Sequence, residues 1–88
     1  MNQKDMQEMF RVLGESNRFK IFKLLSSSKE LCVCKIYEAL KLPQNLASHH
    51  LAVMKKNNMV SARKEGRWIY YSLNKKTLDK LLQFFSTI

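Results

Sequence analysis

The sequence predicts a mostly α-helical protein with one β-hairpin before its last helix, in the order α-α-α-α-β-β-α. Apolar residues recur at helical spacing in most of the chain, whereas residues 60–73 are rich in aromatic and β-branched side chains typical of paired strands. Only two glycines and one proline occur among 88 residues, so few positions interrupt regular structure. A chain of this length allows one small domain, residues 1–88.

The first two helices are expected over residues 3–13 and from Ser16 to residue 25 or 26, with Gly14 between them. Ser16 is the predicted N-cap of the second helix, because a serine hydroxyl can accept a hydrogen bond from a free backbone N–H group there. Met6, Met9, Phe10 and Leu13 recur at helical spacing in the first helix. The predicted buried residues of the second helix are Phe19, Ile21, Phe22, Leu24 and Leu25.

A short helix over residues 33–40 and a longer one to about Lys56 follow, separated by the turn at residues 41–43. Pro43 suits the first turn of the longer helix, where its missing N–H group has no intrahelical partner. Asn57-Asn58 is expected to end that helix, since asparagine tolerates the left-handed conformation. A short helix, a turn and a second amphipathic helix together predict a helix-turn-helix, whose second helix reads DNA in the major groove.

The predicted hairpin has strands around residues 60–64 and 67–73, joined at Glu65-Gly66, and resembles a wing beside the helix-turn-helix. Asn74 is the expected cap of the last helix, which carries an apolar stripe. The predicted DNA-contacting residues are Gln44, Asn45, Ser48 and His49 at the start of the second helix, and Arg63, Lys64 and Arg67 around the hairpin tip.

Charge supports a nucleic-acid partner. The net charge is +9, and residues 55–80 contain eight lysines and arginines against two acids, Glu65 and Asp79. Such a surface attracts a polyanion through phosphate neutralisation and counterion release. An enzyme is not expected, because neighbouring helical residues such as Ser48, His49 and His50 point in different directions and no orienting carboxylate stands near them. We interpret His50 as a hydrogen-bonded structural histidine.

No membrane partner is expected, because no segment approaches the roughly 20 consecutive apolar residues of a membrane span. The chain opens on charged residues rather than an apolar run, so no signal peptide is expected and we predict a cytoplasmic protein. Thiols stay reduced in that compartment. The only two cysteines in the sequence, Cys32 and Cys34, form a close pair at a predicted helix start. They are either a metal-binding or redox-active pair, or two small buried core residues.

Four stretches resemble the ArsR/SmtB family of winged-helix repressors. Leu13–Ile21 resembles the family's opening, and Glu30-Leu31-Cys32-Val33-Cys34 matches the motif of its thiolate-sensing members. Leu42–Leu51 resembles its recognition helix, and Arg63–Leu73 resembles its wing. The resemblance covers almost the whole chain. It implies a homodimer built from the first and last helices, and a palindromic operator that is released when an inducer binds.

The resemblance implies that Cys32 and Cys34 bind arsenite, antimonite or a soft divalent cation such as Cd²⁺ or Pb²⁺, a chemistry that thiolates favour. No other cofactor is expected. The dimer is also supported by an apolar surface larger than so small a monomer can cover. Its predicted members are Met6, Met9 and Phe10 in the first helix and Leu78, Leu81, Leu82 and Phe85 in the last.

Some residues depart from the family pattern. Tyr37 stands where a common arsenic-sensing arrangement has a third thiol. The chain also lacks the N-terminal cysteines of cadmium and lead sensors. Its last helix offers Asp79 without a histidine, whereas zinc and nickel sensors use both residue types there. Lys35 replaces the usual acid, and its charge near a helix start favours thiolate, so we predict at least one cysteine of low pKa. A thiol-based redox sensor, a repressor with purely structural cysteines and a protein-binding winged helix remain alternatives.

Overall fold

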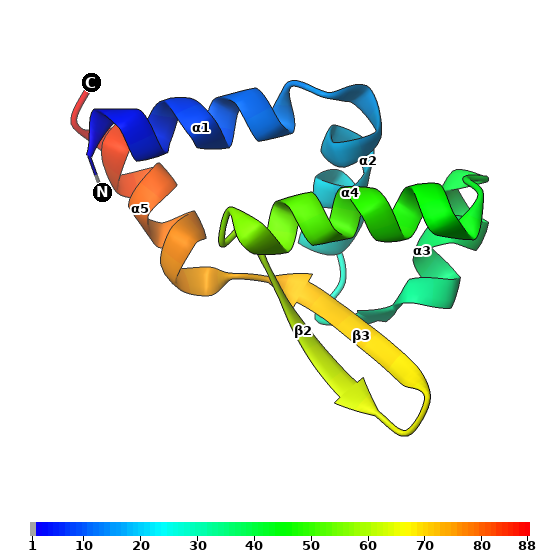
Figure 1. Cartoon of the computed structure of the whole chain (residues 1–88). Coiled ribbons are helices and arrows are strands. Elements are labelled where there is room, and N and C mark those ends of the chain that lie inside the picture. The colour runs from blue at the N-terminus through cyan, green and yellow to red at the C-terminus, as the bar shows by residue number, and fades with distance from the viewer. Residues whose placement is uncertain (1) are drawn as a thin grey trace.

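The protein is described here by a computed structural model covering residues 2–88 (Figure 1), and Met1, the first residue of the predicted domain, lies outside it. Its elements are α1 (Gln3–Leu13), α2 (Ser16–Ser26), β1 (Leu31–Cys32), α3 (Val33–Leu40), α4 (Gln44–Lys56), β2 (Val60–Glu65), β3 (Trp68–Leu73) and α5 (Lys75–Ser86). The predicted class, a mostly helical fold with a β-hairpin wing, is confirmed.

The strand β1 is a correction to the predicted order. It forms an antiparallel edge of a three-stranded sheet with strand order β1-β3-β2, through the pairs Leu31↔Tyr71 and Cys32↔Tyr70. Two residues are too few to display an alternating pattern, so only the partner strand, far away in sequence, defines them as a strand. This pairing attaches the cysteine segment directly to the wing.

The helix ends mostly follow the local signals. Asn74 accepts hydrogen bonds from the backbone N–H groups of Lys76 and Thr77, and Asn58 adopts a left-handed φ of 59° after α4, as predicted. The N-cap of α2 is Glu15 rather than Ser16, because the Glu15 carboxylate accepts the bond from the Arg18 N–H group.

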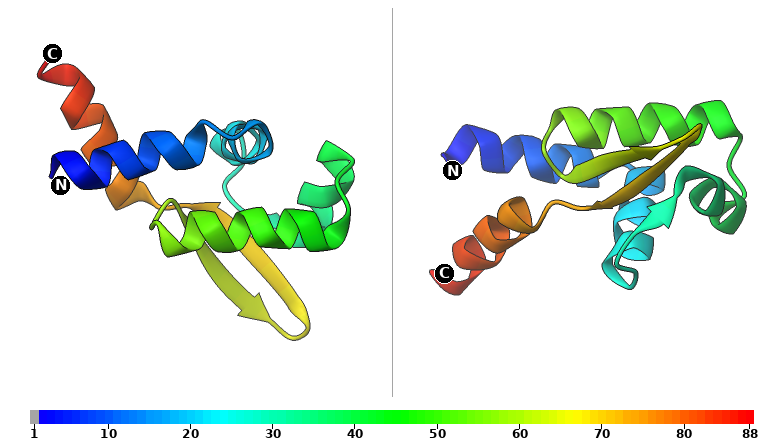
Figure 2. Two further views of the ribbon diagram at one scale, coloured as in Figure 1. Left: turned by 45° about the horizontal axis from the view of Figure 1, so that its top comes forward. Right: turned by 90° about the horizontal axis from the view of Figure 1, so that it is seen from below.

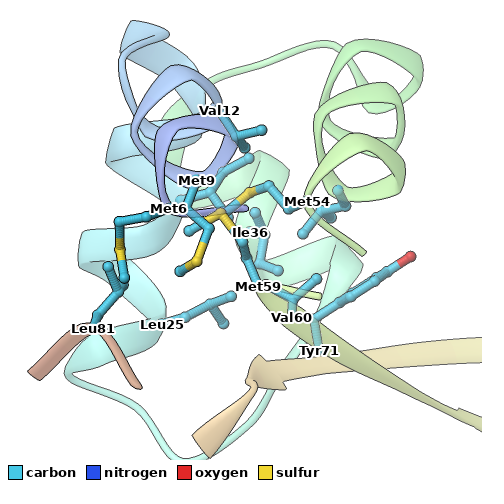
Figure 3. Close-up of a cluster of buried hydrophobic side chains, with 12 residues drawn as sticks. Met6, Met9, Val12, Leu25, Ile36, Met54, Met59, Val60, Tyr71 and Leu81 are labelled. Carbon is cyan, nitrogen blue, oxygen red and sulfur yellow. The ribbon is translucent and has the colours of Figure 1, made fainter. Parts of the chain in front are cut away.

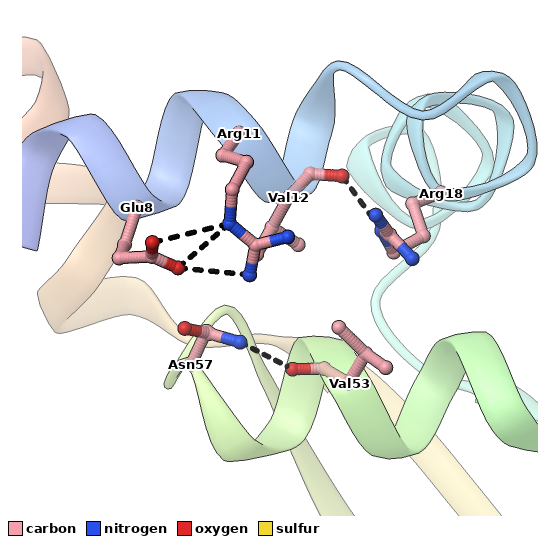
Figure 4. A network of polar contacts seen from close by, with 6 residues as sticks. All are labelled: Glu8, Arg11, Val12, Arg18, Val53 and Asn57. Carbon is pink, nitrogen blue, oxygen red and sulfur yellow. Dashed lines mark hydrogen bonds and ion pairs between the residues drawn. The ribbon is translucent and has the colours of Figure 1, made fainter.

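The core lies where α1, α2, α3 and α4 meet the sheet (Figure 3). Fully buried side chains include Val12, Ile21, Leu25, Ile36, Leu51 and Met54. The predicted burial of Phe19 is wrong, because this side chain is 54% exposed. Arg18 closes the corner between α1 and α2 by donating from Nε to the Val12 carbonyl at 2.7 Å (Figure 4).

The hairpin and the last helix point to opposite ends of the molecule. The start of α4 and the hairpin tip lie at one end, and α5 and both termini lie at the other (Figures 1 and 2). Among residues 2–88, no helix has the length and apolar character needed to cross a bilayer.

Candidate DNA interface, thiol pair and dimer face

Helix α4 presents a polar face to solvent and an apolar face to the core. Ala47, His50, Leu51 and Met54 are buried, which fixes the rotation of the helix. The predicted DNA-contacting residues Gln44, Asn45, Ser48 and His49 are all exposed near its N-terminal end. The same exposed face continues through Ala52, Lys55 and Lys56.

His50 anchors α4 and is structural, as interpreted from the sequence. Its Nδ1 lies 3.3 Å from Arg18 Nη1, and its Nε2 lies 3.8 Å from the Glu15 carboxylate. Arg18 can only donate, so Nδ1 accepts and the proton of the neutral ring sits on Nε2. Burial lowers the pKa of His50 and outweighs the opposing effect of Glu15. The recognition helix is therefore tied to α2 by a neutral histidine.

The wing exposes basic and aromatic side chains at its tip. Glu65 pairs with Trp68 across a two-residue loop, in which Gly66 has a φ of 61° that side chains rarely adopt. Lys64 and Arg67 are exposed, and the Arg67 guanidinium lies over the exposed Trp68 ring at 5.1 Å. These two cations are available to a polyanion.

Arg63 differs from these two cations, because carboxylates already hold it. Its guanidinium donates to Glu30 at 3.0 and 2.8 Å and to Glu65 at 2.7 Å, and it lies over the Tyr70 ring at 4.7 Å. These hydrogen bonds raise the pKa of Arg63 and lower that of Glu30. Sequence reasoning missed Glu30, because its partner stands 33 residues away and no local pattern indicates it.

The two cysteines lie at the junction between β1 and α3. Cys32 is both the last residue of β1 and the N-cap of α3, with extended backbone, and its sulfur accepts a hydrogen bond from the Cys34 backbone N–H at 3.3 Å. Cys34 lies in the first turn of α3. Residues i and i+2 diverge on a regular helix. Here Cys32 is extended and its sulfur lies against the first turn of α3, the turn that contains Cys34.

Their environments give the two thiols different acidities. Burial opposes ionisation of Cys32, but hydrogen bonds from the Cys34 thiol and from the backbone N–H groups of Cys34 and Lys35 outweigh it and lower its pKa. The pKa of Cys34 is raised, first by its hydrogen bond to Cys32 and then by burial. The direction at Cys32 agrees with the prediction of one thiol with a low pKa.

The two sulfur atoms are the kind of ligand that a soft ion prefers, but two ligands do not complete its coordination. Cys32 is only 8% exposed and Cys34 is half-buried. Within residues 2–88, no group of three or more His, Cys, Asp or Glu side chains is placed to hold a metal ion. One protomer therefore offers two sulfur donors, which favour thiophilic ions over magnesium or calcium.

The predicted dimer residues divide into two groups. Met6, Met9 and Leu81 are 6%, 3% and 6% exposed, so the expectation that a monomer leaves them uncovered is wrong: they pack in its core. Phe10, Leu82 and Phe85 are exposed and Leu78 is half-buried. They line an apolar groove formed by α1, α2 and α5, to which Phe19 also contributes.

Comparison with known proteins agrees with this arrangement. Residues 15–62 match the family described as "Bacterial regulatory protein, arsR family", a segment that runs from the cap of α2 into the wing. An uncharacterized HTH-type transcriptional regulator of Methanocaldococcus jannaschii is 48% identical over 64 residues, which are 73% of this chain and 72% of that protein.

Two relatives from Staphylococcus aureus carry named functions. A cadmium resistance transcriptional regulatory protein CadC homolog is 35% identical over 93% of this chain and 68% of its own length. An arsenical resistance operon repressor is 34% identical over all of this chain and 84% of its own length. Among solved structures, the homodimeric winged helix-turn-helix domain of a possible ArsR-family regulator from Mycobacterium bovis has a TM-score of 0.78 and 25% identity, covering 96% of this chain and 77% of that one.

The fold and the exposed helix therefore define a DNA-binding winged-helix transcriptional repressor, and not an enzyme. The chain belongs to the arsR family of bacterial regulatory proteins.

Proposed function

We propose that this protein is a homodimeric repressor that releases a palindromic operator when a thiophilic metal or metalloid binds Cys32 and Cys34. The observation that carries the proposal is the placement of both cysteines at the N-terminus of α3, where the Cys32 sulfur accepts a hydrogen bond from the Cys34 backbone N–H. The inducers we propose are arsenite or antimonite, or Cd²⁺ or Pb²⁺. Two relatives are named as an arsenical resistance operon repressor and as a cadmium resistance transcriptional regulatory protein homolog, and thiolates prefer soft ions.

In this proposal, the start of α4 reads base edges in the major groove. Gln44, Asn45, Ser48 and His49 supply donors and acceptors from one exposed face. Lys64 and Arg67 neutralise backbone phosphates from the wing. Arg63 is held by Glu30 and Glu65, so we assign it a smaller share of the phosphate contact than its charge alone indicates.

The apolar groove containing Phe10, Leu82 and Phe85 supports the homodimer. Several large exposed apolar side chains lie together on α1, α2 and α5, and a second copy would cover them. Two-fold symmetry would then present two recognition helices to successive major grooves, which calls for a palindromic site. We place this action in the cytoplasm, where thiols stay reduced.

Operator binding with and without inducer tests the proposal. We would measure the affinity of the wild-type protein and of Cys32→Ser and Cys34→Ser for the operator, with arsenite, antimonite, Cd²⁺, Pb²⁺ or Zn²⁺ under reducing conditions. We expect a soft ion to release the wild type while both variants stay bound. Release of the variants as well, or no release of the wild type by any of the soft ions, would refute sensing of a metal or metalloid by the pair.

A redox sensor is the second candidate, favoured by the lowered pKa of Cys32 beside the Cys34 thiol. Peroxide would oxidise the Cys32 thiolate to a sulfenic acid, and the Cys34 thiol would then form a disulfide with loss of water. Release of DNA by peroxide alone, and not by metals, would select this candidate over the first. If neither peroxide nor a metal releases the DNA, the cysteines are structural residues.

A further inference from the structure

One arginine joins the wing to the thiol segment. Arg63, on β2, reaches across the middle strand β3 and holds Glu30 through two hydrogen bonds, from Nε at 3.0 Å and from Nη2 at 2.8 Å. Glu30 directly precedes β1, which ends at Cys32. The contact therefore links residues that flank the thiol pair to the strand that leads into the wing tip.

The sheet register places the same groups in one row. Tyr70 pairs with Cys32 on one side and with Arg63 on the other, and paired residues share a face of the sheet. The Arg63 guanidinium lies 4.7 Å from the centre of the Tyr70 ring on its way to Glu30. Cys32, Tyr70 and Arg63 therefore lie in one row across the sheet, and Arg63 is bonded back to Glu30.

Backbone pairing joins the thiol segment to the sheet over a short length, and Leu31 and Val33 pack against the core. Only two residue pairs join β1 to β3. Cys32 is 8% exposed, so a bulky ion has little access to its sulfur in this conformation. An ion held by both sulfurs therefore requires a local shift of the segment that contains Cys32 and Cys34.

We propose that the Glu30–Arg63 pair is a latch that holds the wing in its DNA-binding position and opens when the thiols bind their ion. This inference rests on the proposed function and specifies how it is regulated. Arg63 and Glu30 are positioning residues in this scheme, and the wing carries the signal to DNA. Because linkage is reciprocal, bound DNA must weaken binding of the ion by the same factor.

The test compares Glu30→Gln with Glu65→Gln. Both remove one carboxylate from Arg63, but Glu65 belongs to the wing itself and leaves the attachment to the thiol segment intact. Operator affinity would be measured with and without Cd²⁺, and Cd²⁺ uptake would be followed by the thiolate-to-metal absorption band.

We expect Glu30→Gln to bind the operator more weakly than the wild type without Cd²⁺, and Cd²⁺ to change its affinity by no more than about twofold, against roughly 5–150-fold for a typical coupled system. Loss of a negative charge would by itself strengthen binding to a polyanion, so the sign separates the latch from simple electrostatics. Glu30→Gln should also bind Cd²⁺ more tightly without DNA. Glu65→Gln should respond to Cd²⁺ like the wild type.

The exchanged pair, Glu30→Arg with Arg63→Glu, keeps the net charge and should restore part of the response. If Cd²⁺ releases Glu30→Gln by the same factor as the wild type, the latch is wrong and the proposed function stands. If the wild type takes up Cd²⁺ on its thiols and keeps the operator, the proposed function fails and the latch fails with it.

Discussion

Leu82→Ala is expected to weaken the homodimer without unfolding the protomer. Leu82 exposes 60% of its surface in the groove formed by α1, α2 and α5. Full burial of a leucine side chain is worth about 1.5–3 kcal/mol, so covering the exposed part contributes roughly 1–2 kcal/mol. Two-fold symmetry buries Leu82 from both protomers, so this contribution counts twice. Alanine keeps one methyl group, so the free energy of dimerisation should weaken by about 2–3 kcal/mol, which raises the dissociation constant roughly 30–150-fold.

Sedimentation equilibrium over a range of protein concentrations measures this constant directly. Operator affinity should fall in parallel at protein concentrations below the new dissociation constant, because the palindrome requires two protomers.

Two neighbours of Leu82 on α5 provide matched controls. Gln83→Ala removes an exposed polar side chain and should leave the dimer unchanged. Leu81→Ala removes a buried one and should lower the free energy of unfolding by about 2–5 kcal/mol. A dissociation constant for Leu82→Ala within about twofold of the wild type would refute the assignment of this groove to a second copy.

Three further predictions follow from the cysteine pair, His50 and Lys41. Cys32 should have a lower pKa than an unperturbed cysteine in a thiolate absorbance titration, and a pKa at or above that of a cysteine-containing peptide measured alongside would contradict this direction. Stability should fall as pH drops below the unfolded histidine pKa of about 6.5, because the unfolded chain then binds a proton that folded His50, with its lowered pKa, does not. Denaturant midpoints across this range should therefore decrease toward acid, and His50→Gln should show a flatter profile; equal slopes for both proteins would refute this. Lys41 has a left-handed φ of 54°, which glycine adopts without strain and valine does not. Lys41→Gly should therefore keep or slightly raise the melting temperature, while Lys41→Val should lower the free energy of unfolding by about 1 kcal/mol or more. Equal melting temperatures for the two variants would argue against this backbone conformation.

The secondary structure was predictable largely because its signals are local. The apolar spacing of residues 3–13, the cap at Asn74 and the stop at Asn57-Asn58 each act within one or two helical turns. The exposed start of α4 follows from the same spacing, since burying Ala47, Leu51 and Met54 leaves the other face free.

The candidate site was predictable only in part. The thiol motif was visible in the sequence, but the extended backbone that brings Cys32 toward Cys34 depends on the pairing of β1 with β3. The exposure of Phe19 was not predictable either, because an amphipathic pattern does not indicate how wide a face the neighbouring helices cover.

The sequence by itself determined the order of the five helices and the hairpin, the polar face of the recognition helix and the presence of two thiols at a helix start, since these depend on residues close together in the chain. The tertiary structure alone decided which carboxylate holds Arg63, which strand anchors Cys32, and that Met6, Met9 and Leu81 belong to the core. The reason is physical: those contacts join segments distant in sequence, and their free energy depends on how the packed helices and the sheet register bring them together.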